Sequence, residues 1–383
     1  MNHRQTICNV SVTLISIWLL GIVSYVSNQL SRKEVCIGFA IPIAFFLRYK
    51  LSFAVIVRIF FIVSLILGLV ALMGESYRGT WRWIRVESLH INVSILLGVA
   101  SILFLSSRLI SIFKTILFCV AIILLIANHS FSIAICSTLA GLWILLVNKG
   151  KKFEIAFLIL ILFLVLLGTE QNANRRRRAY EHFFCYERSY QTEQLVRSLS
   201  ETKLFGPCSA SNLHLPGWCH DLAFADVMRK HGLILGILIL ILYGVLLTQL
   251  ANAYIYGSDE VSSYALGAVV YFAILITVHI GVNMGILPPM GVSLPFCGRG
   301  GTAWAAYTFM IAGASPLGDA FKNGSLSAED VRKILLKYLL ILLFMALGFL
   351  VVAYMGKIHH DVKSLQCIKL DKNASNTGSI KNR

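Results

Sequence analysis

The sequence predicts an all-α integral membrane bundle of about ten spans, or eleven. Hydrophobic residues make up 57% of the 383 residues and charged residues 14%, and the mean hydropathy is +0.76. A soluble protein of that composition would expose large apolar patches. Apolar runs long enough to cross a bilayer, roughly 20 residues each, instead follow one another along the chain. They lie near residues 8–27, 35–48, 53–73, 89–106, 110–127, 131–148, 153–169, 232–250, 264–282, 302–318 and 335–355.

The first run, 8–27, is too long and begins too late for an obvious cleaved signal peptide. No small-residue cleavage site follows it, so we interpret it as a retained span. Several short segments beside the spans are basic, and short basic segments stay in the cytoplasm. These basic residues are Arg4, Arg32, Lys33, Lys149, Lys151 and Lys152.

Counting spans from a cytoplasmic amino terminus places the large loop 169–231 outside. Its arginines at 175–178 do not oppose this orientation, because loops longer than about 60 residues cross the membrane largely regardless of charge. Segments 75–89 and 287–301 fall on the same outer side. Three unusual loops therefore converge on one face.

The chain divides into a single transmembrane domain, 1–356, and a basic polar tail, 357–383, which we expect to be disordered. If the run 335–355 is an eleventh span, the basic tail lies outside, which the positive-inside rule disfavours. Either one run is re-entrant, or the chain has an additional helix.

The net charge of +16 comes from 34 Lys and Arg against 18 Asp and Glu. On a membrane protein it favours anionic lipid head groups, at about 1 kcal/mol per basic residue, and no nucleic acid is expected as a partner. The nine cysteines show no metal-binding spacing, although Cys208 and Cys219 could form a disulfide outside the cell. His129 beside Asn128 is either an intramembrane functional site or part of a short turn.

The segment 283–304, NMGILPPMGVSLPFCGRGGTAW, is irregular sequence between two apolar runs. Its prolines remove backbone donors and its glycines permit turns, so a continuous helix is excluded. Irregular backbone at a membrane boundary persists only where it is packed in protein or lines a wet cavity. Composition alone leaves both a functional lining and a connecting loop open.

The segment resembles the last-loop signature of the SEDS family (shape, elongation, division and sporulation) of glycan polymerases, N-x-G-L-L-P-x-x-G-x-x-L-P-F-x-S-Y-G-G-S. The matching residues are Asn283, Gly285, Leu287, Pro288, Gly291, Leu294, Pro295, Phe296, Gly300 and Gly301. Gly298 and Arg299 stand where the family has Ser and Tyr.

Three further stretches resemble family motifs. Arg82, Trp83 and Ile84 match the first outer-loop motif R-W-I, and the run from Tyr190 resembles Y-Q-x-x-Q-S-L-x-A-I-x-S-G-G-L-F-G. LPGWCHDLAFADVMRKHGLILG resembles L-P-E-A-H-T-D-F-I-F-A-V-I-G-E-E-L-G-L-V-G. In this family the aspartate of that motif is regarded as essential for polymerisation, which implies that role for Asp221. The substrate-binding residues implied are Arg82, Trp83, Tyr190, Gln191, Gln194, Asn283, Pro288, Pro295, Arg299, Gly300 and Gly301.

The chemistry agrees with these roles. A carboxylate can accept the proton of an attacking sugar hydroxyl, which typically accelerates a reaction about 10²–10⁴-fold, and a pyrophosphate leaving group needs positively charged donors. Asp221 could instead be a helix N-cap, and the residues alone do not separate it from Asp226. Each arginine could equally be a head-group anchor.

Several positions depart from the family. Gly98 stands where a lysine is usual, residues 128–132 replace a P-D-L-G-T turn, and Arg229 with Lys230 replaces Glu-Glu. The chain is either a diverging active member or one drifting from catalysis.

The resemblance implies a peptidoglycan glycosyltransferase that polymerises lipid II at the outer face of the bacterial cytoplasmic membrane. It also implies a divalent cation, Mg or Mn, and a class B penicillin-binding protein among its division or elongation partners. The alternative is a non-catalytic division scaffold or a lipid-linked precursor transporter (flippase).

Overall fold

The computed structural model describes residues 12–13, 15–17, 19–21, 52–74, 81–86, 89–107, 112–148, 154–155, 158–159, 190–207, 221–298 and 301–315. Several sequence predictions lie outside these residues. They are the apolar run 335–355, the tail 357–383, the arginines 175–178, Cys208, Cys219, Arg299 and Gly300.

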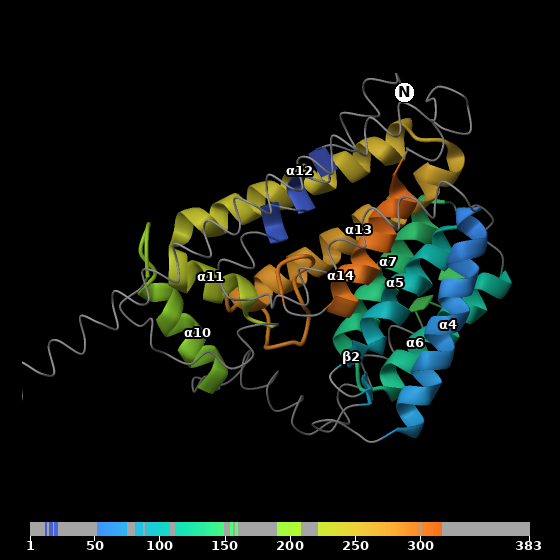
Figure 1. Ribbon diagram of the computed structural model, residues 1–383, viewed down its shortest axis with the longest axis horizontal. Coiled ribbons are helices and arrows are strands. Elements are labelled where there is room, and N and C mark those ends of the chain that lie inside the picture. Colours follow the sequence, from blue (N-terminus) through green and yellow to red (C-terminus); the bar gives the residue numbers. More distant parts are fainter. Residues whose placement is uncertain are drawn as a thin grey trace, which may run out of the picture. The chain divides into compact units, whose positions relative to one another are not determined.

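The described elements are mostly helices (Figure 1). In chain order they are α4 (Phe53–Met73), β1 (Trp83–Val86), β2 (Leu89–Asn92), α5 (Val93–Ser106), α6 (Ile112–Ala127), α7 (Phe131–Val147), α10 (Tyr190–Ser200), α11 (Ala223–His231), α12 (Leu233–Tyr256), α13 (Asp259–Asn283) and α14 (Gly301–Ala314).

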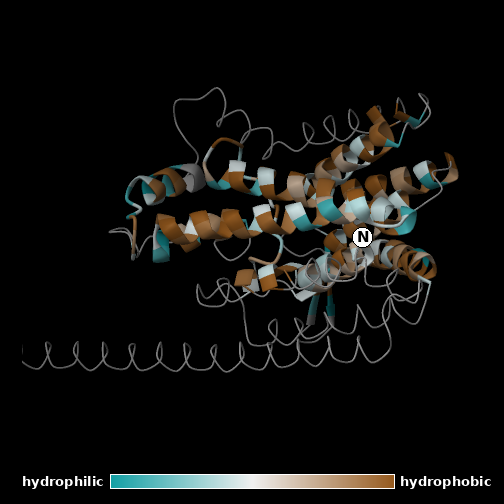
Figure 2. Cartoon of the chain, turned by 90° about the horizontal axis from the view of Figure 1, so that it is seen from above, coloured by the Kyte–Doolittle hydropathy of each residue, from teal (hydrophilic) through white to brown (hydrophobic). Residues whose placement is uncertain are grey.

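Within the described ranges, three helices are long and apolar enough to cross a membrane: α4, α12 and α13. Helices α5, α6 and α7 are shorter but also apolar. Hydrophobic residues predominate along the helices in Figure 2. Large side chains such as Ile59 and Ile241 face outward, 57% and 55% exposed, as expected of surfaces that contact lipid.

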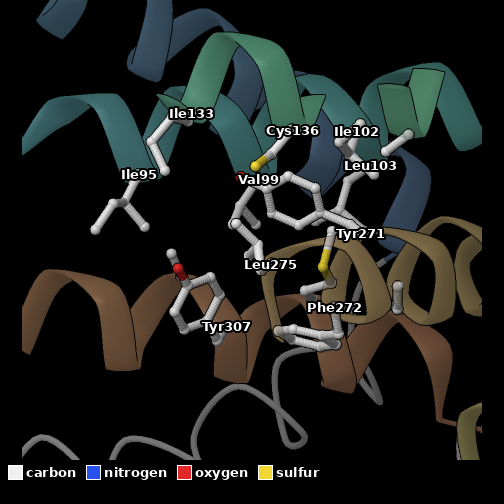
Figure 3. Close-up of a cluster of buried hydrophobic side chains, with 14 of the residues drawn as sticks. Ile95, Val99, Ile102, Leu103, Ile133, Cys136, Tyr271, Phe272, Leu275 and Tyr307 are labelled. Atoms are coloured by element: carbon white, nitrogen blue, oxygen red, sulfur yellow. The ribbon is translucent and has the colours of Figure 1, made fainter. Parts of the chain in front are cut away.

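Helices α5 and α13 form the centre of the bundle. Helix α13 packs against α5, α7, α12 and α14, and α5 also packs against α4 and α6. Figure 3 shows the side chains that fill the space between α5, α7, α13 and α14, which include Val99, Cys136, Tyr271 and Tyr307. This packing fixes the ends of α5 and α13, which adjoin the hairpin and the loop 284–298.

The described elements are helical as predicted, except that residues 83–92 form an antiparallel hairpin that the sequence analysis did not predict. Trp83 pairs with Asn92 and Val86 with Leu89. Helix α5 therefore begins at Val93 rather than at residue 89. The Asn92 side chain caps it by accepting a hydrogen bond from the Ile95 amide at 3.4 Å. Trp83, Ile84 and Val86 favour a strand, but β2 begins at the first residue of the apolar run 89–106, so the run suggested a helix from its start.

The two helices α12 and α13 extend beyond the predicted runs 232–250 and 264–282. They meet at a turn where the Ser258 side chain caps α13 by accepting from the Val261 amide at 3.5 Å. At its other end α13 ends at Asn283, and Gly285, two residues later, has a φ of 70° that few other residues adopt.

Residues 128–130 form the tight turn between α6 and α7, so the turn interpretation of His129 is correct. His129 has a φ of 59°, and its ring lies edge-on to Trp81 at a centroid distance of 4.8 Å. Nδ2 of Asn128 donates to the carbonyl of Gly68 on α4 at 3.4 Å. The turn is thereby held beside the segment that leads into the hairpin.

Candidate functional site

Three of the segments predicted to lie outside meet at Gly291. A Cβ atom at Gly291 would lie 3.4 Å from Nη1 of Arg82, and 3.7 and 3.8 Å from the two carboxylate oxygens of Asp221. The guanidinium and the carboxylate therefore face the same point, although they come from the hairpin and from the turn before α11. A glycine at this position leaves room for both groups to approach the backbone.

The turn that carries Asp221 is fixed by α13. Helix α11 begins at Ala223 with Leu222 in the N-cap position, and a leucine side chain cannot accept a hydrogen bond. Oδ1 of Asn283 supplies the missing acceptor and binds the Ala225 amide at 2.9 Å. Nδ2 of Asn283 donates to the Asp221 carbonyl, also at 2.9 Å. Asp221 lies one residue before the N-cap position. The acceptor that caps α11 is the side-chain amide of Asn283, which belongs to α13.

Arg82 reaches the site from the first residue before β1. Its carbonyl accepts from the Val93 amide at 3.0 Å, and its guanidinium carbon lies 6.0 Å from the centre of the Trp83 ring. Its Nε is buried and has no hydrogen-bond partner among the described residues. A planar guanidinium with donors to spare is suited to binding phosphate oxygens.

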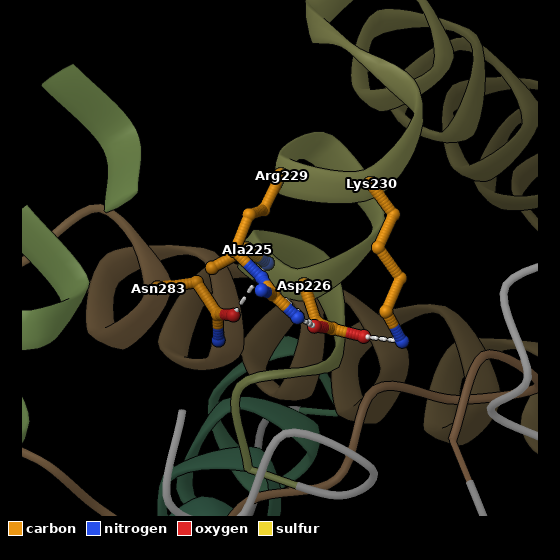
Figure 4. Close-up of polar contacts among 5 residues, drawn as sticks. All are labelled: Ala225, Asp226, Arg229, Lys230 and Asn283. Atoms are coloured by element: carbon orange, nitrogen blue, oxygen red, sulfur yellow. Dashed lines mark hydrogen bonds and ion pairs between the residues drawn. The ribbon is translucent and has the colours of Figure 1, made fainter. Parts of the chain in front are cut away.

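The second carboxylate, Asp226, has a different environment (Figure 4). It is fully buried on α11, and its oxygens lie 2.5 Å from Nη2 of Arg229 and 2.7 Å from Nζ of Lys230. These cations are the residues that replace the family's Glu-Glu. Removing one partner of such a buried pair costs about 3–5 kcal/mol, because a charge is left uncompensated. Asp226 therefore stabilises α11, whereas Asp221 faces Arg82.

The last residue of α11, His231, adds no fixed charge at neutral pH. Burial lowers the pKa of its imidazole, Lys230 lowers it further, and Asp226 opposes both effects. The charges that α11 contributes near its end are thus those of Arg229 and Lys230, balanced in part by Asp226.

The other predicted site residues lie on several different elements. Trp83 is half-buried in β1 and Pro288 is half-buried in the loop after α13. Pro295 is buried, and its carbonyl accepts a hydrogen bond from the Tyr243 hydroxyl of α12. Gly301 is the first residue of α14.

Helix α10 carries the three residues of the Tyr-Gln motif and packs against α11. The structure describes the backbone of Tyr190 and Gln191 in this helix. Gln194 is half-buried, and its Oε1 has no hydrogen-bond partner within the described segments. The structure thus brings Arg82, Asp221 and Asn283 together and leaves the contribution of α10 as a prediction.

Sequence reasoning missed His279. This residue is fully buried on α13, and its Nδ1 lies 2.7 Å from the carbonyl of Val292, next to Gly291. Its sequence position could have revealed it, because His279 is a polar residue within an apolar span and lies four positions before Asn283.

No group of three or more His, Cys, Asp or Glu side chains that could hold a metal ion occurs within the described ranges. Magnesium is often bound by one or two protein carboxylates together with substrate phosphates. Asp221 fits such a role by its position, because both of its carboxylate oxygens face the point at Gly291 that Arg82 also faces.

The fold and the site define a polytopic membrane protein in which an acidic and a basic group meet at one end of the helices. Residues 10–313 match the cell cycle protein family named after FtsW, RodA and SpoVE, and the chain belongs to this family. The SEDS resemblance is thereby confirmed.

Individual relatives are distant. The probable peptidoglycan glycosyltransferase FtsW of Legionella pneumophila is 27% identical over 274 residues, which cover 65% of this chain and 69% of the relative. Stage V sporulation protein E of Bacillus subtilis is 35% identical over 91 residues, 24% of this chain and 25% of the relative.

Solved structures share the fold. The rod shape determining protein RodA of Thermus thermophilus aligns with a TM-score of 0.59 at 18% identity, covering 82% of this chain and 96% of RodA. A chain from a peptidoglycan synthase complex aligns with a TM-score of 0.56 at 16% identity, covering 80% of this chain and 97% of that one. These similarities confirm the predicted membrane helical bundle.

Proposed function

We propose that this protein is a peptidoglycan glycosyltransferase that polymerises lipid II on the outer side of the bacterial cytoplasmic membrane. The observation that carries the proposal is the meeting of the Asp221 carboxylate and the Arg82 guanidinium beside Gly291. The FtsW relatives, described as probable peptidoglycan glycosyltransferases, support the same activity.

The two groups suit the two halves of the reaction. A hydroxyl of the acceptor sugar attacks the anomeric carbon of the donor, a new C–O bond forms, and the bond to the lipid pyrophosphate breaks. Asp221 accepts the hydroxyl proton as the new bond forms. Arg82 donates hydrogen bonds to the pyrophosphate, whose negative charge increases as it leaves.

A divalent cation, Mg or Mn, belongs to this proposal. Asp221 would contribute a carboxylate oxygen, and the substrate's phosphates and water would complete the coordination. When bound, the cation would supply further positive charge at the leaving group. As protein partner we propose a class B penicillin-binding protein, and this proposal is supported by a chain of the same fold that forms part of a peptidoglycan synthase complex.

One observation favours a second candidate, a non-catalytic division scaffold or a flippase. The family lysine is absent at Gly98, and the place its side chain would occupy is filled, because a Cβ there would lie 2.8 Å from the Tyr271 hydroxyl oxygen. A scaffold needs no lysine at this position. An enzyme that lacks the lysine needs another positively charged residue to stabilise the pyrophosphate leaving group. In our proposal Arg82, which matches a family motif, supplies positive charge at the leaving group without that lysine.

The test uses the purified full chain, with and without a class B penicillin-binding protein, incubated with lipid II and analysed for glycan strands. We expect the wild type to form strands and Asp221→Asn to lose about 10²–10⁴-fold in rate, because the amide cannot accept the proton. Asp226→Asn is the matched control. It should lower the melting temperature while each folded molecule keeps most of its activity.

Strand formation by Asp221→Asn at the wild-type rate would remove Asp221 from the mechanism. No strands from the wild type under any condition, with normal binding of lipid II, would favour the scaffold or the flippase.

A further inference from the structure

We propose that His279 and Asn283, one turn apart on α13, are positioning residues that hold Asp221 and the 284–298 loop in register at the reaction point. We call these two residues the α13 polar pair. The inference rests on the proposed function for its catalytic consequence, but the contacts themselves are independent of it. Neither residue is catalytic, because each acts through the backbone of a neighbouring segment.

Asn283 uses its whole amide group. Its two N–H donors bind the carbonyls of Asp221 at 2.9 Å and His279 at 2.8 Å, and its oxygen accepts from Ala225 at 2.9 Å. The side chain is fully buried. An aspartate here would lose both donors, and a leucine would lose all three bonds. The position therefore selects an amide, and two of the bonds act on the segment that carries Asp221.

His279 forms a hydrogen bond with the 284–298 loop. Its Nδ1 lies 2.7 Å from the Val292 carbonyl, and since a carbonyl oxygen only accepts, Nδ1 must carry the proton. The carbonyl of His279 in turn accepts from Asn283. The pair thus forms a continuous connection from Val292, next to Gly291, to the backbone of Asp221.

The two anchored positions flank the point where the reacting groups meet. Gly291 precedes Val292 directly and lies against both Arg82 and Asp221. If the pair is lost, the carboxylate and the loop can shift relative to each other, and a misplacement of about 1 Å can cost on the order of 10²-fold in rate. The rest of the bundle does not depend on these bonds, since α13 remains packed against α5, α7, α12 and α14.

The first measurement is the initial rate of strand formation by purified His279→Leu and Asn283→Leu, corrected for the folded fraction. We expect kcat to fall about 10–100-fold in each variant, with KM for lipid II changed less than about threefold. The double variant should be no worse than the more affected single variant, because both act on one unit. His279→Asn should recover most of the rate, since its amide nitrogen can replace Nδ1 as the donor.

Thr138→Val is the matched control. It removes one buried side-chain hydrogen bond, from Thr138 to the Ala134 carbonyl at 2.8 Å, on α7. We expect a loss of stability with kcat unchanged. If the His279 and Asn283 variants behave like Thr138→Val, the pair is merely structural and the proposal is overturned.

The second measurement, hydrogen exchange read by mass spectrometry, is independent of activity. Asn283→Leu should accelerate exchange in the peptide covering 221–226, where the Ala225 amide loses its acceptor, and leave the peptide covering 131–147 unchanged. Unaltered exchange at 221–226 would overturn the proposal. If the wild type forms no strands, the proposed function fails, and this exchange measurement alone decides whether the pair holds Asp221.

Discussion

At the level of single residues, Asp221 and Asp226 differ in what surrounds their carboxylates. Asp226 is buried between Arg229 and Lys230, whereas Asp221 lies at the point shared with Arg82 and Gly291. The sequence alone could not distinguish them, because both are acidic residues at the start of a helix. The loss of the family's Glu-Glu also has a physical account, since the two basic replacements pair with an aspartate where the family pattern has valine.

Arg82 should be the arginine on which turnover depends. We expect Arg82→Ala to lower kcat for lipid II polymerisation about 10²–10³-fold, because a donor to the leaving pyrophosphate is lost. Arg82→Lys should retain part of the rate, since the charge remains but the planar pair of donors does not.

Arg197→Ala is the control for Arg82, measured in the same steady-state assay. Arg197 lies on α10, its side chain is 63% exposed, and it makes a surface ion pair with Glu201 at 3.5 Å. Such pairs contribute about 0–1 kcal/mol, so its removal should leave the rate nearly unchanged. Equal effects of the two alanine variants would mean that Arg82 serves the lipid surface rather than the substrate.

At the level of elements, the contact between α5, α7 and α13 depends on a missing side chain. A Cβ at Gly98 would lie 2.8 Å from both Cγ2 of Ile133 and the hydroxyl oxygen of Tyr271. Small residues let helices approach closely in a membrane. The position at which the family has a lysine is thus a packing contact, and the tyrosine hydroxyl lies where the new side chain would begin. Figure 3 shows Tyr271 among the side chains between these helices.

Restoring the family's lysine should therefore fail. We expect Gly98→Ala to destabilise the protein by about 1–3 kcal/mol through overpacking, and Gly98→Lys to do so more strongly. Thermal unfolding of the detergent-solubilised protein measures both effects. Gly98→Ala combined with Tyr271→Phe should recover part of the loss, because the hydroxyl oxygen nearest the new methyl group is removed. A Gly98→Ala protein as stable as the wild type would show that this contact relaxes easily.

At the level of the whole molecule, the described spans could be predicted because each of their helices corresponds to one apolar run in the sequence. The family could be predicted from the Gly/Pro-rich segment 283–304. The hairpin could not be found, because β1 is only four residues long and β2 lies within the apolar run that continues into α5. The meeting of Arg82 with Asp221 could not be found either, since the sequence separates them by more than a hundred residues. The cap of α11 could not be predicted from the sequence either, because the acceptor is Asn283 on α13 and not a residue near Leu222 in the chain.

The order of helices also predicts which ends face outward. The hairpin, the α6–α7 turn and the loop after α13 meet at one end of the bundle, so the α12–α13 turn lies at the other. A cysteine at Arg197 should react with an impermeant maleimide on intact cells. A cysteine at Tyr256, the last residue of α12, should react only after permeabilisation, with the unaltered chain as background. The reverse pattern would place the site on the cytoplasmic side.

The cap that α11 receives from Asn283 has a consequence for biogenesis. During synthesis the ribosome delivers α11 and α12 to the membrane before α13, so the Asp221 turn first emerges without the amide that organises it. A nascent chain that ends before residue 283 has no acceptor for the Ala225 amide and no donor for the Asp221 carbonyl. The turn that carries Asp221 therefore lacks both of these hydrogen bonds until α13 has been synthesised.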